Sequence, residues 1–465
     1  MPTGPKTFVD VHVDEAGRRT LIFTSEADEG GAPERHIDRL LSPGQQDYLD
    51  LFERMAHDLG TRMPRNRTVR ALPAATTYHQ PLLTGNISPD IRYGYGDPAV
   101  LRVSEEDCWY LVVTSNDAPD SFPILRTPDL VSWELAGFVF PAGSKPAWAQ
   151  DGAGYSDYWA PELHKVGNEY LVCFAAREHD ESFSIGIARA QSPAGPFTVP
   201  AEPLIRGGVI DAHIFVSAGG DPLLLWKRDS NELWPRLLVQ MIAQDRSLAE
   251  ALFAIPQDQR TAGICADLWS WGGDLPPMEQ FFLLQPLIEA VVDNFADVRR
   301  RLTELGTAEG LLVLEAMRTP IYAQRLLPDG SALLGDPTTV LVNDLDWEAH
   351  LIEGPWLTEQ DGRFYLFYSG NDFSTHEYGI GVAVADDPLG PYRKVEQPLL
   401  RSNARWSGPG HPSVAPSPEE QPHLFYHAFF PGSAGYKEFR ALLMAGLRFH
   451  ADGVEIGGAG SGFTG

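Results

Sequence analysis

The chain has 465 residues, 43% of them hydrophobic, which is enough to form the core of one large or two ordinary globular domains. Its 63 acidic residues outnumber its 36 lysines and arginines and give a formal net charge of −27, which repels nucleic acid and anionic lipid headgroups. The composition therefore predicts a globular protein that has no nucleic acid and no membrane as a partner.

No apolar run reaches the roughly 20 residues of a membrane span, and the first residues lack the apolar stretch of a secretory signal. We therefore expect a cytoplasmic protein. Of the three cysteines, Cys108, Cys173 and Cys265, two lie inside apolar strand-like runs, where a buried free thiol is the common state. Neither a disulfide nor a cysteine-based metal site is expected.

Residues 1–80 are interpreted as an N-terminal extension. Apolar and polar residues alternate in residues 8–13 and 20–23, which indicates a pair of strands, and residues 45–59 have the composition of a helix. We expect this extension to pack on the domain that follows it.

Five short aromatic and β-branched runs follow, each after a turn rich in glycine, aspartate or asparagine, a pattern typical of buried strands. They recur at intervals of about 53 to 61 residues, apart from one interval that is about 80 residues longer. This period is typical of propeller blades. The sequence therefore predicts an all-β fold, a five-bladed β-propeller over residues 81–465. The runs begin at Trp109, Tyr170, Leu223, Phe364 and His423.

Two turns of the same chemistry also recur. Residues 192–197 and 387–392 both combine proline and glycine with a final aromatic residue, and each follows a strand in which glycine alternates with apolar residues. Because proline and glycine fix the same bend twice, these turns indicate repeated structural units.

The long interval contains residues 231–318, where apolar residues are spaced three and four apart as on one helix face. This spacing predicts a helical insertion that interrupts one blade. At the rim of the propeller, such an insertion would wall a central pocket or form a dimer contact. The spaced residues are Leu284, Leu287, Ile288, Val291, Val292, Phe295, Val298 and Leu302.

A polar residue opens each predicted blade, about eight to twelve residues before its apolar run. The innermost strands of a propeller converge on a central channel, so these residues should face one another. Carboxylates gathered in this way repel one another, which keeps one protonated beside a charged neighbour, as the cleavage of sugar linkages requires. The five residues are Asp97, Glu162, Asp211, Glu353 and His411.

Six segments carry a family resemblance: residues 96–98, 122–133, 158–162, 210–215, 353–356 and 408–413. Their order and blade spacing resemble glycoside hydrolase family 43, a group of five-bladed propellers that act mostly on arabinose- and xylose-containing glycans. The resemblance covers about residues 85–228 and 319–445. No single segment is diagnostic, but six in the correct order are specific.

The resemblance implies that Asp97 is the general base, Glu353 the general acid, and Asp211 the residue that tunes and holds the acid. An inverting glycosidase needs a charged carboxylate and a protonated one about 6.5 to 9.5 Å apart, and a third carboxylate raises the pKa of the acid. The structural alternatives are a turn cap for Asp97 and a strand-end hydrogen bond for Asp211.

The other two blade-opening residues have open roles. The resemblance gives Glu162 a structural or pocket-lining part. It places His411 at the channel centre, where the family's histidine lines the pocket or contacts a calcium ion through water; a core histidine is the alternative. Here Pro412 follows where asparagine is frequent, and the sequence shows no set of oxygen ligands for calcium. No cofactor is expected to be required.

Sugar rings stack on aromatic side chains, so residues of this kind near the acids are candidates for substrate contact. We expect two or three of five to line the pocket and the others to lie in the core. The five are Phe122, Trp159, His213, Trp226 and Trp356. The resemblance also implies that Arg440 binds substrate, the alternative being a surface ion pair.

The sequence thus favours an exo-acting, inverting hydrolase that releases terminal arabinofuranose or xylose from a small oligosaccharide. A fructan-acting or phosphorolytic relative is a second interpretation, weakened because Asp97 is followed by Pro-Ala-Val and the segment Asn-Asp-Pro-Asn-Gly of retaining fructosidases is missing here. A propeller that binds glycan or protein without catalysis is the third, and the presence of all three acids argues against it.

Overall fold

The structure is a computed structural model that describes residues 7–13, 19–25, 34–41, 57, 60–62, 80–152, 154–217, 219–272, 275–435 and 437–457. The chain divides into two compact units. We call residues 70–229 with 318–465 the β unit, and residues 1–69 with 230–317 the helical unit.

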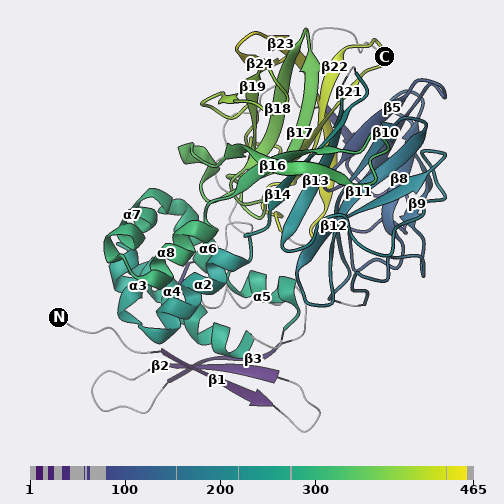
Figure 1. The fold of residues 1–465 in the computed structure, drawn as a ribbon. Coiled ribbons are helices and arrows are strands. Elements are labelled where there is room, and N and C mark those ends of the chain that lie inside the picture. The colour runs from purple at the N-terminus through teal and green to yellow at the C-terminus, as the bar shows by residue number, and fades with distance from the viewer. Residues whose placement is uncertain are drawn as a thin grey trace. The chain divides into compact units, whose positions relative to one another are not determined.

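Among its described residues, the β unit contains five antiparallel sheets (Figure 1). Sheet 1 contains β5 (Ala99–Val103), β6 (Cys108–Val112), β8 (Ser121–Thr127) and β9 (Glu134–Phe140). Sheet 2 contains β12 (Phe183–Ala190), β11 (Glu169–Arg177), β10 (Asp157–Val166) and β7 (Ser115–Asn116). Sheet 3 contains β13 (Val209–Val216), β14 (Pro222–Arg228), β15 (Pro320–Leu326) and β16 (Leu333–Val342).

The last two sheets have the same plan. Sheet 4 contains β17 (Ile352–Gln360), β18 (Arg363–Gly370), β19 (Gly379–Ala385) and β20 (Arg393–Lys394). Sheet 5 contains β21 (Ser407–Pro416), β22 (Pro422–Phe429), β23 (Arg440–His450) and β24 (Gly453–Ile456), and β4 (Gln80–Leu83) pairs with β23. The predicted mostly β fold is confirmed.

One strand of each sheet contributes to a closed ring of contacts. β5 contacts β10, β10 contacts β13, β13 contacts β17, β17 contacts β21, and β21 contacts β5 again. The first and last of these strands, β5 and β21, lie about 300 positions apart along the chain, so the ring brings together segments that are remote in sequence.

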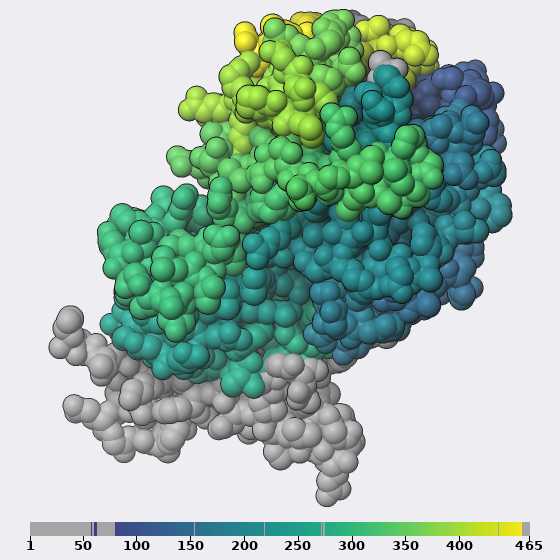
Figure 2. Space-filling model, viewed as in Figure 1, coloured from purple at the N-terminus to yellow at the C-terminus, as the bar shows by residue number. Residues whose placement is uncertain are grey.

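The five apolar runs of the sequence are the second strands of the five sheets. Almost every residue of β6, β11, β14, β18 and β22 is buried. Both faces of these strands are covered by neighbouring sheets, which is why the runs are continuously apolar and do not alternate. By contrast, most residues of the outer strand β16 are exposed, and this strand is visible as a green band in Figure 2.

The two repeated turns share one geometry. The bonds Gly195–Pro196 and Gly390–Pro391 are both cis, and the two glycines have the same φ of 86°. The sequence prediction of matching turns is confirmed.

The predicted helical insertion lies between β14 and β15, which pair with each other across it. The apolar set is buried apart from Phe295, which is half-buried. The spaced residues belong to more than one helix: Asn294 ends α6 and begins α7, and its side chain donates to the Ala290 carbonyl and to Asp258. The helices are α2 (Leu233–Gln244), α3 (Ser247–Leu252), α4 (Pro256–Gly272), α5 (Pro277–Leu283), α6 (Gln285–Asp293), α7 (Phe295–Leu305) and α8 (Ala308–Ala316).

The predicted N-terminal strand pair is confirmed as β1 (Thr7–Val13) and β2 (Arg19–Ser25), and β3 (Glu34–Leu41) adds a third antiparallel strand. The predicted helix over residues 45–59 lies outside the described residues except for residue 57. Residues 1–69 group with the helices, whereas we had expected them to pack on the propeller. None of the described helices is both long and apolar enough to span a membrane.

Candidate active site

A residue with left-handed backbone conformation lies at or near the start of each of the five strands that form the ring of contacts. In β10, β13, β17 and β21 the pairing register shifts at this residue, as in a β-bulge, and in sheet 1 the residue lies just before β5. The five residues are Asp97 (φ 51°), Ala160 (φ 46°), Asp211 (φ 58°), Gly354 (φ 55°) and His411 (φ 51°).

We call these five left-handed positions the layer of the acids. They differ in part from the set of equivalent residues predicted from the sequence. Asp97, Asp211 and His411 occupy the layer, whereas Glu353 precedes the equivalent residue of its strand by one position. Glu162 was assigned to the wrong layer, because Ala160 is the left-handed residue of β10 and Glu162 follows it by two positions. Glu162 therefore lies further along β10, beyond the register shift between Trp159 and Glu162.

The left-handed residues are joined to the preceding sheets by hydrogen bonds. A bulge removes a backbone N–H from the ladder, and such a buried group needs another acceptor. At four junctions within the described residues, a side chain of one sheet accepts the N–H of the left-handed residue in the next, which fixes the acids relative to each other. The pairs are Thr114 with Ala160 (2.8 Å), Asp211 with Gly354 (2.8 Å), Ser369 with His411 (2.7 Å) and His427 with Asp97 (3.1 Å).

Asp97 is surrounded by groups that stabilise its charge. Its Oδ1 lies 2.8 Å from Arg440 Nη1, 3.4 Å from His427 Nδ1 and 3.6 Å from His411 Nδ1, and the Thr114 hydroxyl donates to its other oxygen. Burial raises the pKa of Asp97, but Arg440, the two histidines and the threonine together outweigh it and hold this pKa well below its usual range. Asp97 is therefore a carboxylate throughout the neutral pH range.

Asp211 and Glu353 form a second, buried pair of acids. Tyr378 donates to Glu353 Oε1 at 2.7 Å, and Lys227 Nζ lies 3.3 Å from Glu353 Oε2. Burial and then the negative charge of Glu353 raise the pKa of Asp211 well above its usual range. Like-charge repulsion was expected to raise the pKa of the acid Glu353, whereas the raised pKa lies at its neighbour Asp211.

A fourth buried acid, Asp372, lies just beyond β18. Burial, assisted by the charge of Glu353, raises its pKa to about 6, even though the Ser374 hydroxyl and N–H donate to it. His350 Nε2 lies 3.6 Å from Asp372 Oδ2. The sequence analysis missed Asp372 because this residue follows an apolar run, whereas the predicted site residues all precede one.

The same reason explains four other residues that the sequence analysis missed. Each terminates an apolar run, at the point where a second strand reaches the layer of the acids. A polar residue directly after such a run was the available signal. The residues are Thr114, Lys227, Ser369 and His427.

Glu162 belongs to a hydrogen-bonded layer further along the strands. Its Oε2 lies 2.7 Å from His213 Nδ1 and 2.9 Å from His164 Nε2, and the Trp356 ring packs 4.6 Å from the His213 ring. Burial lowers the pKa of His213 to about 3, so this ring is neutral. The contacts support the structural interpretation of Glu162.

Of the aromatic candidates, two belong to the hydrophobic core. Phe122 packs against Phe140 and Phe174, and Trp226 packs against Tyr322. Phe122 and Trp226 were candidates for substrate contact. This is corrected, because both side chains are buried between the sheets. Trp159 is half-buried and donates to Asn116. It stays a candidate, whereas His213 and Trp356 are buried in the Glu162 layer.

Residues 88–260 and 311–454 match the model of glycosyl hydrolases family 43, which is more than half of the chain. The chain belongs to this family. It is 23% identical over 245 residues to "Xylosidase/arabinosidase 43A" of Humicola insolens, which covers 52% of this chain and 59% of that protein. It is 22% identical over 370 residues to "Xylosidase/arabinosidase" of Bacteroides ovatus, covering 77% and 92%. A solved thermostable family-43 glycoside hydrolase has a TM-score of 0.57 at 26% identity, covering 82% and 96%.

Among the described residues, the side chains around His411 supply no set of oxygen ligands that would hold a calcium ion directly. Calcium takes six to eight oxygen ligands. His411 offers one nitrogen, Nε2, which has no hydrogen-bond partner among the described residues, and its nearest carboxylate, Asp97, is engaged by Arg440. A water-mediated contact stays a prediction.

A second group, Glu162, His164 and Cys173, has ligand atoms within 4.8 Å of one another. The Cys173 thiol donates to the Ala212 carbonyl at 2.9 Å, and Glu162 Oε2 lies within hydrogen-bond distance of both His164 Nε2 and His213 Nδ1. The group is accounted for by hydrogen bonds.

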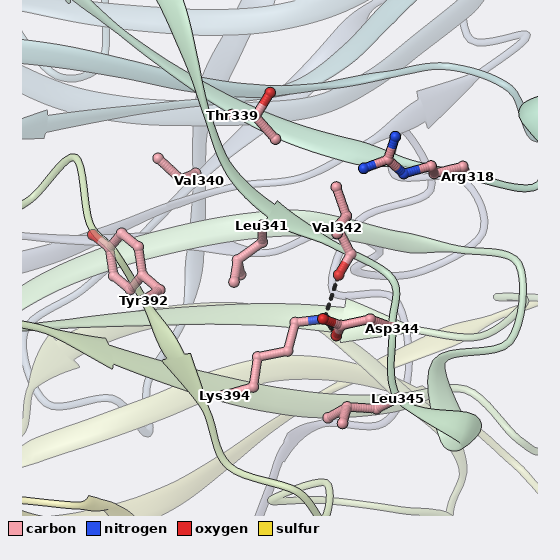
Figure 3. Close-up of a pocket in the computed structure, with 9 residues that line it drawn as sticks. All are labelled: Arg318, Thr339, Val340, Leu341, Val342, Asp344, Leu345, Tyr392 and Lys394. Carbon is pink, nitrogen blue, oxygen red and sulfur yellow. Dashed lines mark hydrogen bonds and ion pairs between the residues drawn. The ribbon is translucent and has the colours of Figure 1, made fainter.

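A surface pocket of about 360 Å³ includes none of Asp97, Asp211 and Glu353 (Figure 3). Its charged residue Lys394 is already bound to Asp344 at 2.8 Å and to Glu348 at 2.7 Å. The pocket is lined by Arg318, Thr339, Val340, Leu341, Val342, Asp344, Leu345, Tyr392 and Lys394.

Proposed function

We propose that the protein is an exo-acting, inverting glycosidase whose five sheets are the blades of a β-propeller, with the acids at its centre. The observation that carries this proposal is the contrast between the acids. Arg440 holds Asp97 charged, while burial and the charge of Glu353 raise the pKa of Asp211 well above its usual range. A base and an acid on separate strands are the two groups that inversion requires.

In the proposed mechanism, Asp97 accepts a proton from water as the water attacks the anomeric carbon. Glu353 donates the proton of the buried pair to the leaving oxygen. The Lys227 ammonium and the Tyr378 hydroxyl then stabilise the Glu353 carboxylate that forms, and Asp211 holds the next residue, Gly354, in place through its N–H.

The proposed substrate is a small oligosaccharide that ends in arabinofuranose or xylose. The names of the two relatives support a pentose, and the whole chain's activity is a proposal because the chain spans 59% of the Humicola relative.

The test is turnover of arabinosyl and xylosyl fluorides and of short arabino- and xylo-oligosaccharides by the native protein, Asp97→Asn and Glu353→Gln. We expect each substitution to reduce kcat on the oligosaccharides by about 10²- to 10⁴-fold, because each removes one proton-transfer group. The matched control is Glu359→Gln, an exposed acid on the same strand as Glu353, which should retain native turnover.

Circular dichroism shows whether each variant is folded. Full turnover by folded Asp97→Asn and Glu353→Gln would exclude these roles. The anomer released first, observed by NMR, tests inversion separately, since retention of the substrate's configuration contradicts it.

A further inference from the structure

Three aromatic side chains, Trp406, Phe430 and Phe439, form what we call the aromatic shelf. They lie at the end of sheet 5 where the three strands β21, β22 and β23 are in register: Ser407 pairs with Phe429, and Phe429 pairs with Arg440. Each shelf residue is the next one beyond this row. The Phe430 ring centroid lies 5.2 Å from that of Trp406 and 6.1 Å from that of Phe439.

The shelf adjoins the charged acid of the site. Phe439 directly precedes Arg440, whose Nη1 lies 2.8 Å from Asp97 Oδ1. Tyr95, which precedes Asp97 by two residues, also packs edge-on against Phe439, with 6.1 Å between the ring centroids. The aromatic surface and the catalytic layer are therefore parts of the same end of the β unit.

Phe430 differs from its two neighbours in exposure. Trp406 is buried and Phe439 is half-buried, but Phe430 is 41% exposed. Among the large apolar side chains that the described part of the chain exposes, it is the only aromatic one. Its ring plane is tilted by 33° from that of Trp406 and by 20° from that of Phe439. A ring packed on two others in this way has little freedom to move, and its exposed surface offers an apolar contact for the C–H face of a sugar.

We propose that the aromatic shelf binds a second sugar residue of the substrate, next to the one that is hydrolysed. This inference rests on the proposed glycosidase function. The occupant is the same oligosaccharide that reaches Asp97, because the shelf is continuous with the Arg440–Asp97 pair. The shelf thus selects chains of two or more sugars over substrates that present only one ring.

The test compares Phe430→Ala with the native protein on a glycosyl fluoride and on the matching di- and trisaccharide. The fluoride carries a single sugar ring, so its kcat/KM should be unchanged. The kcat/KM for the oligosaccharides should fall about 2- to 12-fold, the loss typical of one stacking contact. Phe430→Tyr should restore it, and Leu334→Ala, which truncates another exposed apolar side chain, should have no effect.

Three outcomes would overturn the proposal. Equal losses on the fluoride and the oligosaccharides would mean that the ring supports the acids instead. Unchanged kcat/KM on all substrates would mean that no sugar contacts the ring. A change in oligomeric state on size-exclusion chromatography, with unchanged kcat/KM, would mean that another protein copy covers it.

If the native protein cleaves none of these substrates, the proposed function fails and the shelf is tested by binding alone. Isothermal titration of xylo- and arabino-oligosaccharides then compares the native protein with Phe430→Ala. Weaker binding by the variant supports the shelf, and equal or absent binding contradicts it.

Discussion

At the level of single residues, the charge of Asp97 depends most on Arg440 among the groups that lower its pKa. Replacing Arg440 with methionine removes this cation and raises the pKa of Asp97. The base then becomes protonated at a higher pH, so the acid limb of the kcat/KM profile should move upward by about one unit or more.

The matched control for this prediction is Arg448→Met, which removes an exposed arginine from the same strand, β23. Its acid limb should coincide with that of the native protein. Arg440→Met can lower kcat/KM at every pH through lost substrate contact, so the position of the limb is the deciding measurement. An unmoved limb would show that Arg440 does not set the charge of Asp97.

The raised pKa of Asp372 leads to a prediction about the stability of the folded protein. Its pKa in the folded protein is raised to about 6, so the folded state binds more protons than the unfolded state between about pH 4 and pH 6. The contribution of this group to stability is therefore lost as pH rises through that range. Asp372→Asn keeps a carbonyl to accept from Ser374 and should stabilise the protein by about 1 to 3 kcal/mol at pH 8.

Denaturant unfolding at pH 4.5 and pH 8 tests this directly. The gain from Asp372→Asn should be small at the lower pH and full at the higher one. Asp386→Asn, an exposed acid, is the control and should change stability little at either pH. A gain that is equal at both pH values would point to packing and not to ionisation.

At the level of elements, the hydrogen bonds between neighbouring sheets make a prediction about Ser369. Its hydroxyl accepts the N–H of His411 at 2.7 Å, and both residues are buried. Ser369→Ala leaves that N–H without an acceptor and should lower the free energy of unfolding by about 1 to 3 kcal/mol. Ser144→Ala, which removes an exposed hydroxyl bonded to the Pro141 carbonyl, should cost less than about 0.5 kcal/mol.

Urea unfolding measures the free energy of unfolding that Ser369→Ala and Ser144→Ala each lose relative to the native protein. A loss for Ser369→Ala no larger than that for Ser144→Ala would mean that water replaces the missing acceptor. In that case the junctions between sheets would depend on packing alone.

The elements also show what the sequence could predict. Continuous apolar runs located the second strands because burial on both faces leaves no room for polar residues. They could not locate the bulges, because positive φ occurs here at aspartate, alanine and histidine and not only at glycine. Ala160 is the example: Glu162 was assigned to the layer of the acids because it carries a charge, whereas the backbone places alanine there.

The candidate site was predicted in part for a related reason. Asp97, Asp211 and Glu353 precede apolar runs at a repeating distance, which is a local signal. Their partners Lys227 and His427 lie on other strands and Tyr378 lies just before β19, and their contacts depend on how the sheets pack. Pairing between sheets is not encoded by any spacing along the chain.

At the level of the whole molecule, the sequence pattern could not predict that residues 1–69 group with the helices. Arg62 illustrates why: its Nε lies 3.0 Å from Asp258, and its backbone N–H donates to Thr261 at 2.8 Å. These contacts join residues almost 200 positions apart, with sheets 1 and 2 and part of sheet 3 between them in the sequence.

The division into units predicts that the β unit can fold without the helical unit. All of the contacts described for Asp97, Asp211 and Glu353 lie within residues 70–229 and 318–465. Lys227 on β14 pairs directly with Ile321 on β15, so the two ends are as close as neighbouring strands and a short Asn-Gly turn can join residue 229 to residue 318.

We expect this shortened chain to show a β-type circular dichroism spectrum, to unfold cooperatively in urea, and to cleave a glycosyl fluoride within about tenfold of the full chain, since the β unit carries the proposed proton-transfer groups. Glu359→Gln and Asp97→Asn in the shortened chain provide the active and inactive controls. A shortened chain that is insoluble or unfolds without cooperativity would show that sheet 3 needs its helical insertion to fold. A folded but inactive one would show that the helical unit supplies something to catalysis that the acids alone do not provide.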